Sequence, residues 1–119
     1  MSSDASIEAF YSFVNADAFD PDASDRSIDI INPWTGSTVA QMHCAGTTGI
    51  NHAVAAAKTA FQKNRNATRL QRSQWLEAAA ARIDADQDAL SGMMVKMIGK
   101  PVKAAKFEVG RSAAFIRSC

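Results

Sequence analysis

The sequence predicts a mainly α-helical segment that carries one β-hairpin near its amino end. Between residues 50 and 116, apolar residues recur at helical spacing in four successive stretches. Between residues 28 and 42, apolar and polar residues alternate on either side of a turn that contains proline and glycine. With 119 residues, of which 47% are hydrophobic, the chain is long enough to bury one modest core.

The first expected element is a short amphipathic helix over residues 4 to 16, starting near Ser3 or Asp4. Apolar residues at spacings of three and four predict it: Ile7, Phe10, Tyr11 and Val14. Residues 17–27 are acidic and contain serine and proline, which favours a loop. Residues 1–26 are therefore expected to be an N-terminal helix and an acidic loop.

Residues 28–42 are expected to form the hairpin. Its alternating apolar residues are Ile28, Ile30, Val39 and Met42. In the turn between the strands, Pro33 restricts φ and Gly36 can adopt a positive φ. Because a two-stranded hairpin is marginally stable alone, we expect the rest of its sheet to be encoded beyond this chain.

The first two of the four later helices have clear starting signals. Thr47 or Thr48 is the expected N-cap of the first, which runs to about Asn64, and the second begins around Thr68. Their apolar faces carry Ile50, Ala53, Val54, Ala57 and Phe61, and then Trp75, Leu76, Ala79, Ala80 and Ile83. Both helices should therefore bury one face.

The third helix is expected to start near Asp86 and to end at Gly99, and Pro101 suits the first turn of the fourth. Their apolar stripes are Leu90, Met93, Met94 and Met97, and then Val102, Ala105, Val109, Ala113 and Ile116. We interpret the methionines as core residues. No stop signal precedes Cys119, so the last helix is expected to be truncated.

The composition excludes several classes of partner. Thirteen basic and twelve acidic residues are interspersed and give a net charge of +1, which argues against binding of nucleic acid. No apolar run approaches the roughly 18 residues of a membrane helix, and no signal peptide is visible. Two cysteines make no disulfide framework, so we expect a cytoplasmic protein.

The residues by themselves assign no catalytic and no cofactor-binding group. Cys44, on a predicted strand, is interpreted as a small packed apolar residue. With His43 and His52 it matches no zinc-ligand spacing. Gly46 and Gly49 lack the dinucleotide fingerprint and are interpreted as a connection from the hairpin to a helix.

Three segments in chain order carry recognisable motifs: NPWTG at residues 32–36, AVAAAKTAF at residues 53–61, and GKP at residues 99–101 with FEVGR at residues 107–111. They resemble the NPxTG turn, the AVxAAxxAF helix and the GKP…EV segment of the aldehyde dehydrogenase superfamily. Two residues depart from the family pattern, Trp34 in the turn and Met97 two residues before the glycine.

The resemblance implies an N-terminal fragment of an enzyme with the α/β aldehyde dehydrogenase fold. Residues 27–119 would be the N-terminal part of its cofactor-binding domain. The parent would use NAD or NADP to oxidise an aldehyde to the carboxylic acid through a cysteine thiohemiacetal, and it would be a homo-oligomer. In the family the catalytic groups lie beyond residue 119, so the fragment alone is expected to be inactive. A self-contained helical protein-interaction module is the alternative.

The resemblance also implies roles for four residues. Glu108 would help to hold a structural sodium or potassium ion, with the backbone carbonyls of Ile30 and Ile31; oxygen ligands suit such a cation. Arg111 resembles an arginine that some subfamilies direct toward an anionic substrate, and a guanidinium suits that task. The alternatives are a solvated glutamate and an ordinary surface arginine.

Overall fold

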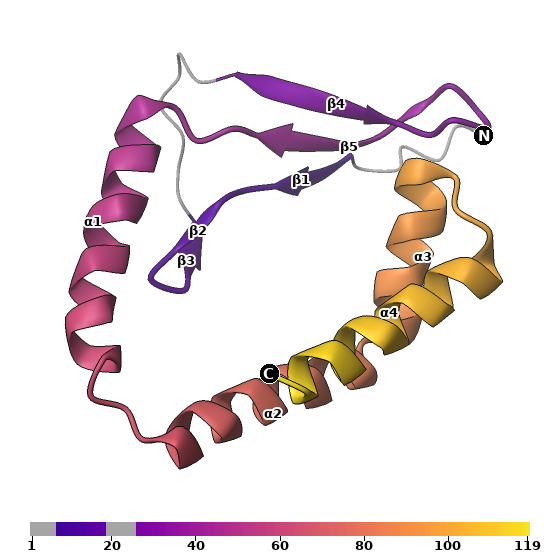
Figure 1. The fold of residues 1–119 in the computed structure, drawn as a ribbon. Helices are drawn as coiled ribbons and strands as arrows, with labels where there is room; N and C mark the ends of the chain where they lie inside the picture. Colours follow the sequence, from indigo (N-terminus) through magenta and orange to yellow (C-terminus); the bar gives the residue numbers. More distant parts are fainter. Residues whose placement is uncertain (1–6, 19–25) are drawn as a thin grey trace. The chain divides into compact units, whose positions relative to one another are not determined.

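The computed structural model describes residues 7–18 and 26–119. The chain divides into two compact units, Met1–Arg65 and Asn66–Cys119 (Figure 1). Among the described residues, no helix has the length and apolar character that crossing a membrane requires.

The first unit contains a mixed three-stranded sheet in the order β1-β5-β4. Its strands are β1 (Glu8–Phe10), β4 (Ser27–Ile31) and β5 (Thr38–His43). The central strand β5 pairs antiparallel with β4 and parallel with β1. Two further short strands, β2 (Phe13–Val14) and β3 (Asp17–Ala18), pair antiparallel with each other. The hairpin thus obtains its third strand from within the chain, and the expectation that all of its sheet partners lie beyond it is wrong.

The helix predicted over residues 4 to 16 is wrong for the residues that the structure describes. Strand β1 completes the hydrogen bonding of the free edge of β5, with Glu8 opposite Ala40, and a helix would forgo these pairings. Asn15 and Ala16 have φ values of 55° and 69°, which make the turn between β2 and β3 and are incompatible with a right-handed helix. The predicted start at Ser3 or Asp4 lies outside the described residues, as does the centre of the predicted acidic loop.

The predicted hairpin is confirmed as β4 and β5. In its turn, the Asn32 side-chain oxygen accepts hydrogen bonds from the backbone N–H groups of Trp34, at 2.8 Å, and Thr35, at 3.2 Å. Gly36 has a φ of 70°, as the turn chemistry predicted. The strand register shifts between Ile30 and Ile31, so the regular ladder is interrupted at the end of β4.

Helix α1 (Thr47–Asn64) completes the first unit and confirms the predicted bounds. Gly46, not a threonine, occupies the N-cap, and no side chain caps the helix, so the predicted cap is wrong. Gly46 lies in the expected connection between β5 and α1, but Gly49 lies inside the first turn of α1, so the expectation is wrong for Gly49. The apolar face of α1 remains largely open, with Ile50, Val54 and Phe61 between 57% and 63% exposed.

The second unit consists of α2 (Arg69–Ala85), α3 (Gln87–Ile98) and α4 (Val102–Arg117). Thr68 and Gln71 form a capping box at the start of α2, where the sequence predicted a helix start. Gly99 ends α3 in the left-handed conformation with a φ of 69°, and Pro101 occupies the N-cap of α4. Each boundary follows from local chemistry that the sequence already carries.

Helix α4 packs against both α2 and α3, and the core of the unit lies along this contact. Small residues dominate this core; its fully buried or nearly buried apolar members are Ala80, Ala105, Val109 and Ala113. Small side chains permit a close approach of helices. The methionines predicted as core, Met93, Met94 and Met97, are half-buried.

Candidate functional site

The candidate site is a hollow on α4, which we call the α4 hollow. It is lined by Met94, Glu108, Val109, Arg111, Ser112, Phe115 and Ile116. Glu108, Arg111, Ser112 and Phe115 stand at spacings of three and four, so they share one face of the helix. Glu108 and Arg111, the two charged residues to which the family resemblance gives a role, therefore line the same hollow.

Glu108 is held by a lysine from the connection between α3 and α4. The left-handed Gly99 and the N-cap residue Pro101 turn the chain, and between them Lys100 places its ammonium against Oε2 of Glu108. The Lys100 side chain is 26% exposed and that of Glu108 47% exposed. The Glu108 carboxylate thus has a counter-charge within its own unit, which the sequence reasoning missed because a separation of eight residues matches no helical pair rule.

Arg111 lies next to this pair and is exposed. Among the described residues no ion pair or hydrogen bond engages its guanidinium. Phe115 and Ile116 supply an apolar wall in the same hollow. A free guanidinium beside an apolar wall can bind an organic anion through paired hydrogen bonds.

The proposed carbonyl ligands Ile30 and Ile31 belong to the other unit. They end β4, an edge strand, at the position where the ladder register shifts. Edge strands and register shifts of this kind leave some backbone carbonyl oxygens outside the ladder. Within residues 7–18 and 26–119, no group of three or more histidine, cysteine, aspartate and glutamate residues could hold a metal ion.

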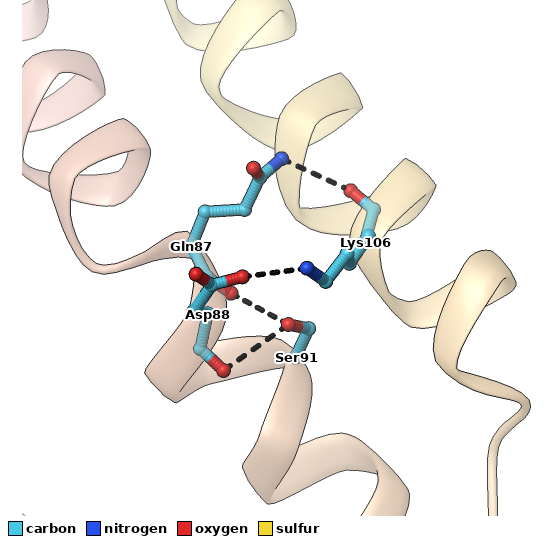
Figure 2. A network of polar contacts seen from close by, with 4 residues as sticks. All are labelled: Gln87, Asp88, Ser91 and Lys106. Carbon is cyan, nitrogen blue, oxygen red and sulfur yellow. Dashed lines mark hydrogen bonds and ion pairs between the residues drawn. The ribbon is translucent and has the colours of Figure 1, made fainter.

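A polar network joins α3 to α4 (Figure 2). Asp88 Oδ1 lies 2.7 Å from Nζ of Lys106, and the Gln87 side-chain amide donates to the Lys106 carbonyl at 3.3 Å. The Ser91 hydroxyl donates to the carbonyls of Gln87 at 2.7 Å and Asp88 at 3.2 Å. This network joins the two helices, and no pattern in the sequence predicts it.

The resolved pKa shifts in the second unit arise in surface ion pairs. The hydrogen bond from Lys106, and then its charge, hold the pKa of the Asp88 carboxyl below its usual value. A hydrogen bond to Asp86 raises the pKa of Arg82. Hydrogen bonds to Asp84 and Glu77 raise the pKa of Arg117. The hydrogen bonds and ion pairs that cause these pKa shifts stabilise the charge that each group already carries at neutral pH.

Neither cysteine of the chain lies in the α4 hollow. Cys44 follows β5 and is half-buried, in keeping with its interpretation as a packed residue, and Cys119 is exposed. His43 stacks on Tyr11 with ring centroids 4.7 Å apart and planes 7° apart. The α4 hollow can therefore bind and orient a ligand, but it holds no thiol nucleophile.

Comparison with known protein sequences identifies the family that this chain matches. The sequence model described as the aldehyde dehydrogenase family matches residues 19–119. The succinate-semialdehyde dehydrogenase (NADP(+)) 1 of Mycobacterium ulcerans is 38% identical over 87 residues, which are 72% of this chain and 19% of that protein. The succinate-semialdehyde dehydrogenase (NADP(+)) of Mycobacterium avium is 36% identical over 91 residues, 76% of this chain and 19% of that protein.

A solved structure shows the same fold. The NAD-dependent aldehyde dehydrogenase from Sinorhizobium meliloti superposes with a TM-score of 0.85 and 27% sequence identity. The superposition covers 94% of this chain and 23% of that one. This chain therefore spans about a fifth of the length of the curated relatives it matches.

Proposed function

The chain belongs to the aldehyde dehydrogenase family, and from this premise we propose that it is the N-terminal segment of an NAD(P)-dependent aldehyde dehydrogenase. The parent enzyme oxidises an aldehyde to the carboxylic acid through a thiohemiacetal on a cysteine outside this chain. The observation that carries the proposal is the family match over residues 19–119, which includes all three motif segments. Residues 27–119 form the N-terminal part of its cofactor-binding domain.

Arg111 binds the carboxylate of the substrate in this proposal. Its guanidinium has no partner within the described part of the chain and lies beside the apolar wall of Phe115 and Ile116. A short aldehyde that carries a second, anionic end matches this combination of charge and apolar surface. The relatives from the two mycobacteria are named for succinate semialdehyde, a compound of that class.

Glu108 contributes charge to a structural sodium or potassium site together with the carbonyls of Ile30 and Ile31. The donor set of one carboxylate and strand carbonyls suits a hard cation. The register shift at Ile30 and Ile31 supports the availability of backbone oxygen there. Lys100 already neutralises Glu108, so the cation competes with an ammonium for this carboxylate.

NAD or NADP, when bound, accepts the hydride of the aldehyde, and no residue of this chain is assigned to it. Gly46 precedes α1 and Gly49 lies in its first turn, and the two glycines lack the dinucleotide fingerprint. We further propose a cytoplasmic homo-oligomer. The alternative, a helical interaction module, draws on the exposed apolar faces of α1 and α4, but it leaves the family membership unexplained.

The test compares this chain with the protein encoded by its complete reading frame. Each is incubated with NAD or NADP and with succinate semialdehyde or butanal, and formation of reduced nicotinamide is followed. We expect turnover from the complete protein and none from the 119-residue chain. Turnover that follows the concentration of the purified chain contradicts the assignment of the catalytic groups to other sequence.

The role of Arg111 is tested in the complete protein by Arg111→Gln. Loss of a charge-assisted pair of hydrogen bonds should lower kcat/KM for succinate semialdehyde about 10- to 100-fold and leave butanal nearly unaffected. Lys103→Gln removes a charge from an exposed position of the same helix and is the matched control. Equal effects of Arg111→Gln on both aldehydes would remove Arg111 from the substrate site.

A further inference from the structure

The second unit carries another hollow, at the start of α2 and the end of α4, which shares no residue with the α4 hollow. We call it the arginine hollow, because three of its lining residues are Arg69, Arg72 and Arg117. Leu76 adds an apolar surface, and the remaining lining residues are Ser73, Glu77 and Cys119. Neither the family resemblance nor the proposed function gives this hollow a role.

One of the three arginines already has its counter-charges. Nε of Arg117 lies 3.1 Å from Oε1 of Glu77, and its Nη2 lies 2.7 Å from Oδ2 of Asp84. These two ion pairs fasten the end of α4 to α2. Arg117 therefore forms a wall of the hollow without adding uncompensated charge.

Arg69 and Arg72 carry positive charge that no ion pair within the described part of the chain neutralises. Nη1 of Arg72 donates to the Ala67 carbonyl at 3.1 Å, a neutral partner that orients the guanidinium and leaves its charge in place. The Arg69 side chain has no hydrogen bond or ion pair among the described residues. Two guanidinium groups at a spacing of three thus line one hollow with most of their donors unused.

Ser73 adds a third donor on the same face of α2. It follows Arg69 by four residues, the spacing of neighbours on a helix surface. Within the described residues its hydroxyl makes no hydrogen bond. The first turn of α2 also contains no acidic residue, so two cations stand at the helix end where negative charge is favoured.

From this arrangement we propose that Arg69, Arg72 and Ser73 form a binding site for a phosphoryl group. Two guanidinium forks and one hydroxyl present donors in more than one plane. The oxygens of a phosphate are arranged tetrahedrally and can accept from all three side chains, whereas the two oxygens of a carboxylate lie in one plane with a single fork. The unbalanced charge of two arginines matches the charge of a phosphate monoester or of inorganic phosphate.

The experiment titrates the 119-residue chain with inorganic phosphate and follows the backbone and arginine side-chain resonances by NMR. Glycerol 3-phosphate provides a phosphate monoester, succinate provides a dianionic carboxylate, and sodium chloride matches the ionic strength. We expect both phosphates to shift the resonances of Arg69, Arg72 and Ser73, with succinate binding about tenfold more weakly. A response to inorganic phosphate alone would assign the site to free phosphate, and a response to both would extend it to phosphate monoesters.

Variants locate the site. Arg69→Gln and Arg72→Gln should each weaken phosphate binding about tenfold, because each removes a charge and a donor fork. Lys103→Gln removes a charge from an exposed position of α4 that lines neither hollow, and this variant should bind phosphate as the parent does. Far-ultraviolet circular dichroism checks that each variant keeps its helices. If Arg72→Gln unfolds through loss of its hydrogen bond to Ala67, Arg69→Gln decides, since the Arg69 side chain has no hydrogen bond or ion pair to lose among the described residues.

Several results would overturn the proposal. Resonance shifts that sodium chloride reproduces would show screening of charge and no site. Equal affinity for succinate would show a site for anions in general. Unchanged phosphate binding in a folded Arg69→Gln variant would place the phosphate elsewhere. Because each readout is binding to this chain and involves no aldehyde oxidation, these outcomes do not depend on the proposed enzymatic function.

Discussion

Nζ of Lys106 lies 2.7 Å from Oδ1 of Asp88, and this ion pair fastens α4 to the first turn of α3. Both side chains are largely exposed, at 51% and 86%. A pair so open to solvent contributes little by itself. The ion pair acts together with a second contact between the same two helices, because the Gln87 side-chain amide donates a hydrogen bond to the Lys106 carbonyl.

The pair predicts an acid-sensitive part of the stability of the second unit. The folded-state pKa of Asp88 lies below its unfolded value, so the stabilisation is complete above the ordinary aspartate pKa of about 3.9. It is lost as the pH falls through the lower folded value. Urea unfolding of the parent and of Asp88→Asn should therefore differ at neutral pH and converge in acid. In a Lys106→Gln background the difference should shrink, and an unchanged difference would contradict the pairing.

Two helical glycines should respond differently to alanine. A Cβ on Gly92 meets nothing within 4 Å, so Gly92→Ala should stabilise the chain by about 0.5–1 kcal/mol through helix propensity. A Cβ on Gly110 would lie 3.2 Å from Nε2 of Gln87 and disturb its hydrogen bond to Lys106. Gly110→Ala should therefore stabilise less than Gly92→Ala, or destabilise. Thermal unfolding measures both, and equal gains would refute the close contact between α3 and α4.

The core of the second unit should not tolerate larger side chains. Ala113 is fully buried on α4, and the neighbouring Ala114 is exposed. Ala113→Leu should cost about 1–3 kcal/mol through overpacking. Ala114→Leu should change the free energy of unfolding by less than about 0.5 kcal/mol. Similar effects of the two substitutions in urea unfolding would show that α4 does not present this face to its neighbours.

In the complete enzyme, Glu108→Gln should reduce the dependence of the melting temperature on potassium or sodium. Because the carboxylate is 47% exposed and paired with Lys100, the loss should be about 1 kcal/mol or less. Melting in potassium chloride is compared with melting in choline chloride at equal ionic strength. Glu77→Gln, which removes another carboxylate paired with a basic side chain, is the control. Identical cation responses of parent and Glu108→Gln would eliminate the cation site.

The isolated chain should associate through its exposed apolar side chains. Phe61 on α1 is 60% exposed, and Phe115 on α4 is 69% exposed. Large apolar surfaces of this kind favour contact with other chains. Light scattering should show a dimer or larger species, and Phe61→Lys should reduce it more than Gln62→Lys, which adds the same charge without removing an apolar group. A monomeric parent chain would refute this prediction.

The sequence predicted those elements whose signals are local. The turn at Asn32 to Gly36, the cap at Thr68 and the stop at Gly99 each depend on the conformational preference of a few adjacent residues. Local preferences act within any fold, so they can be recognised without one. The shared helical face of Glu108 and Arg111 also follows from their spacing alone.

The failed prediction at the amino end shows the opposite case. Ile7, Phe10, Tyr11 and Val14 have helical spacing, but residues Glu8–Phe10 form a strand because the free edge of β5 supplies hydrogen-bond partners some 30 positions later in the chain. A short stretch of sequence around residues 8–10 does not contain the strand that pairs with them. The tertiary contact outweighs a weak local preference.

By itself, the sequence determined the family, the hairpin and the four helices. Motif order, turn chemistry and apolar periodicity depend on residues that are close together in the chain, so they can be recognised without the fold. Only the tertiary structure decided the third strand of the sheet, the pairing of Lys100 with Glu108 and the unused donors of Arg69 and Arg72. The physical reason is that charges and strand edges find partners by distance in space. That distance is set by how whole elements pack, and spacing along the chain does not encode it.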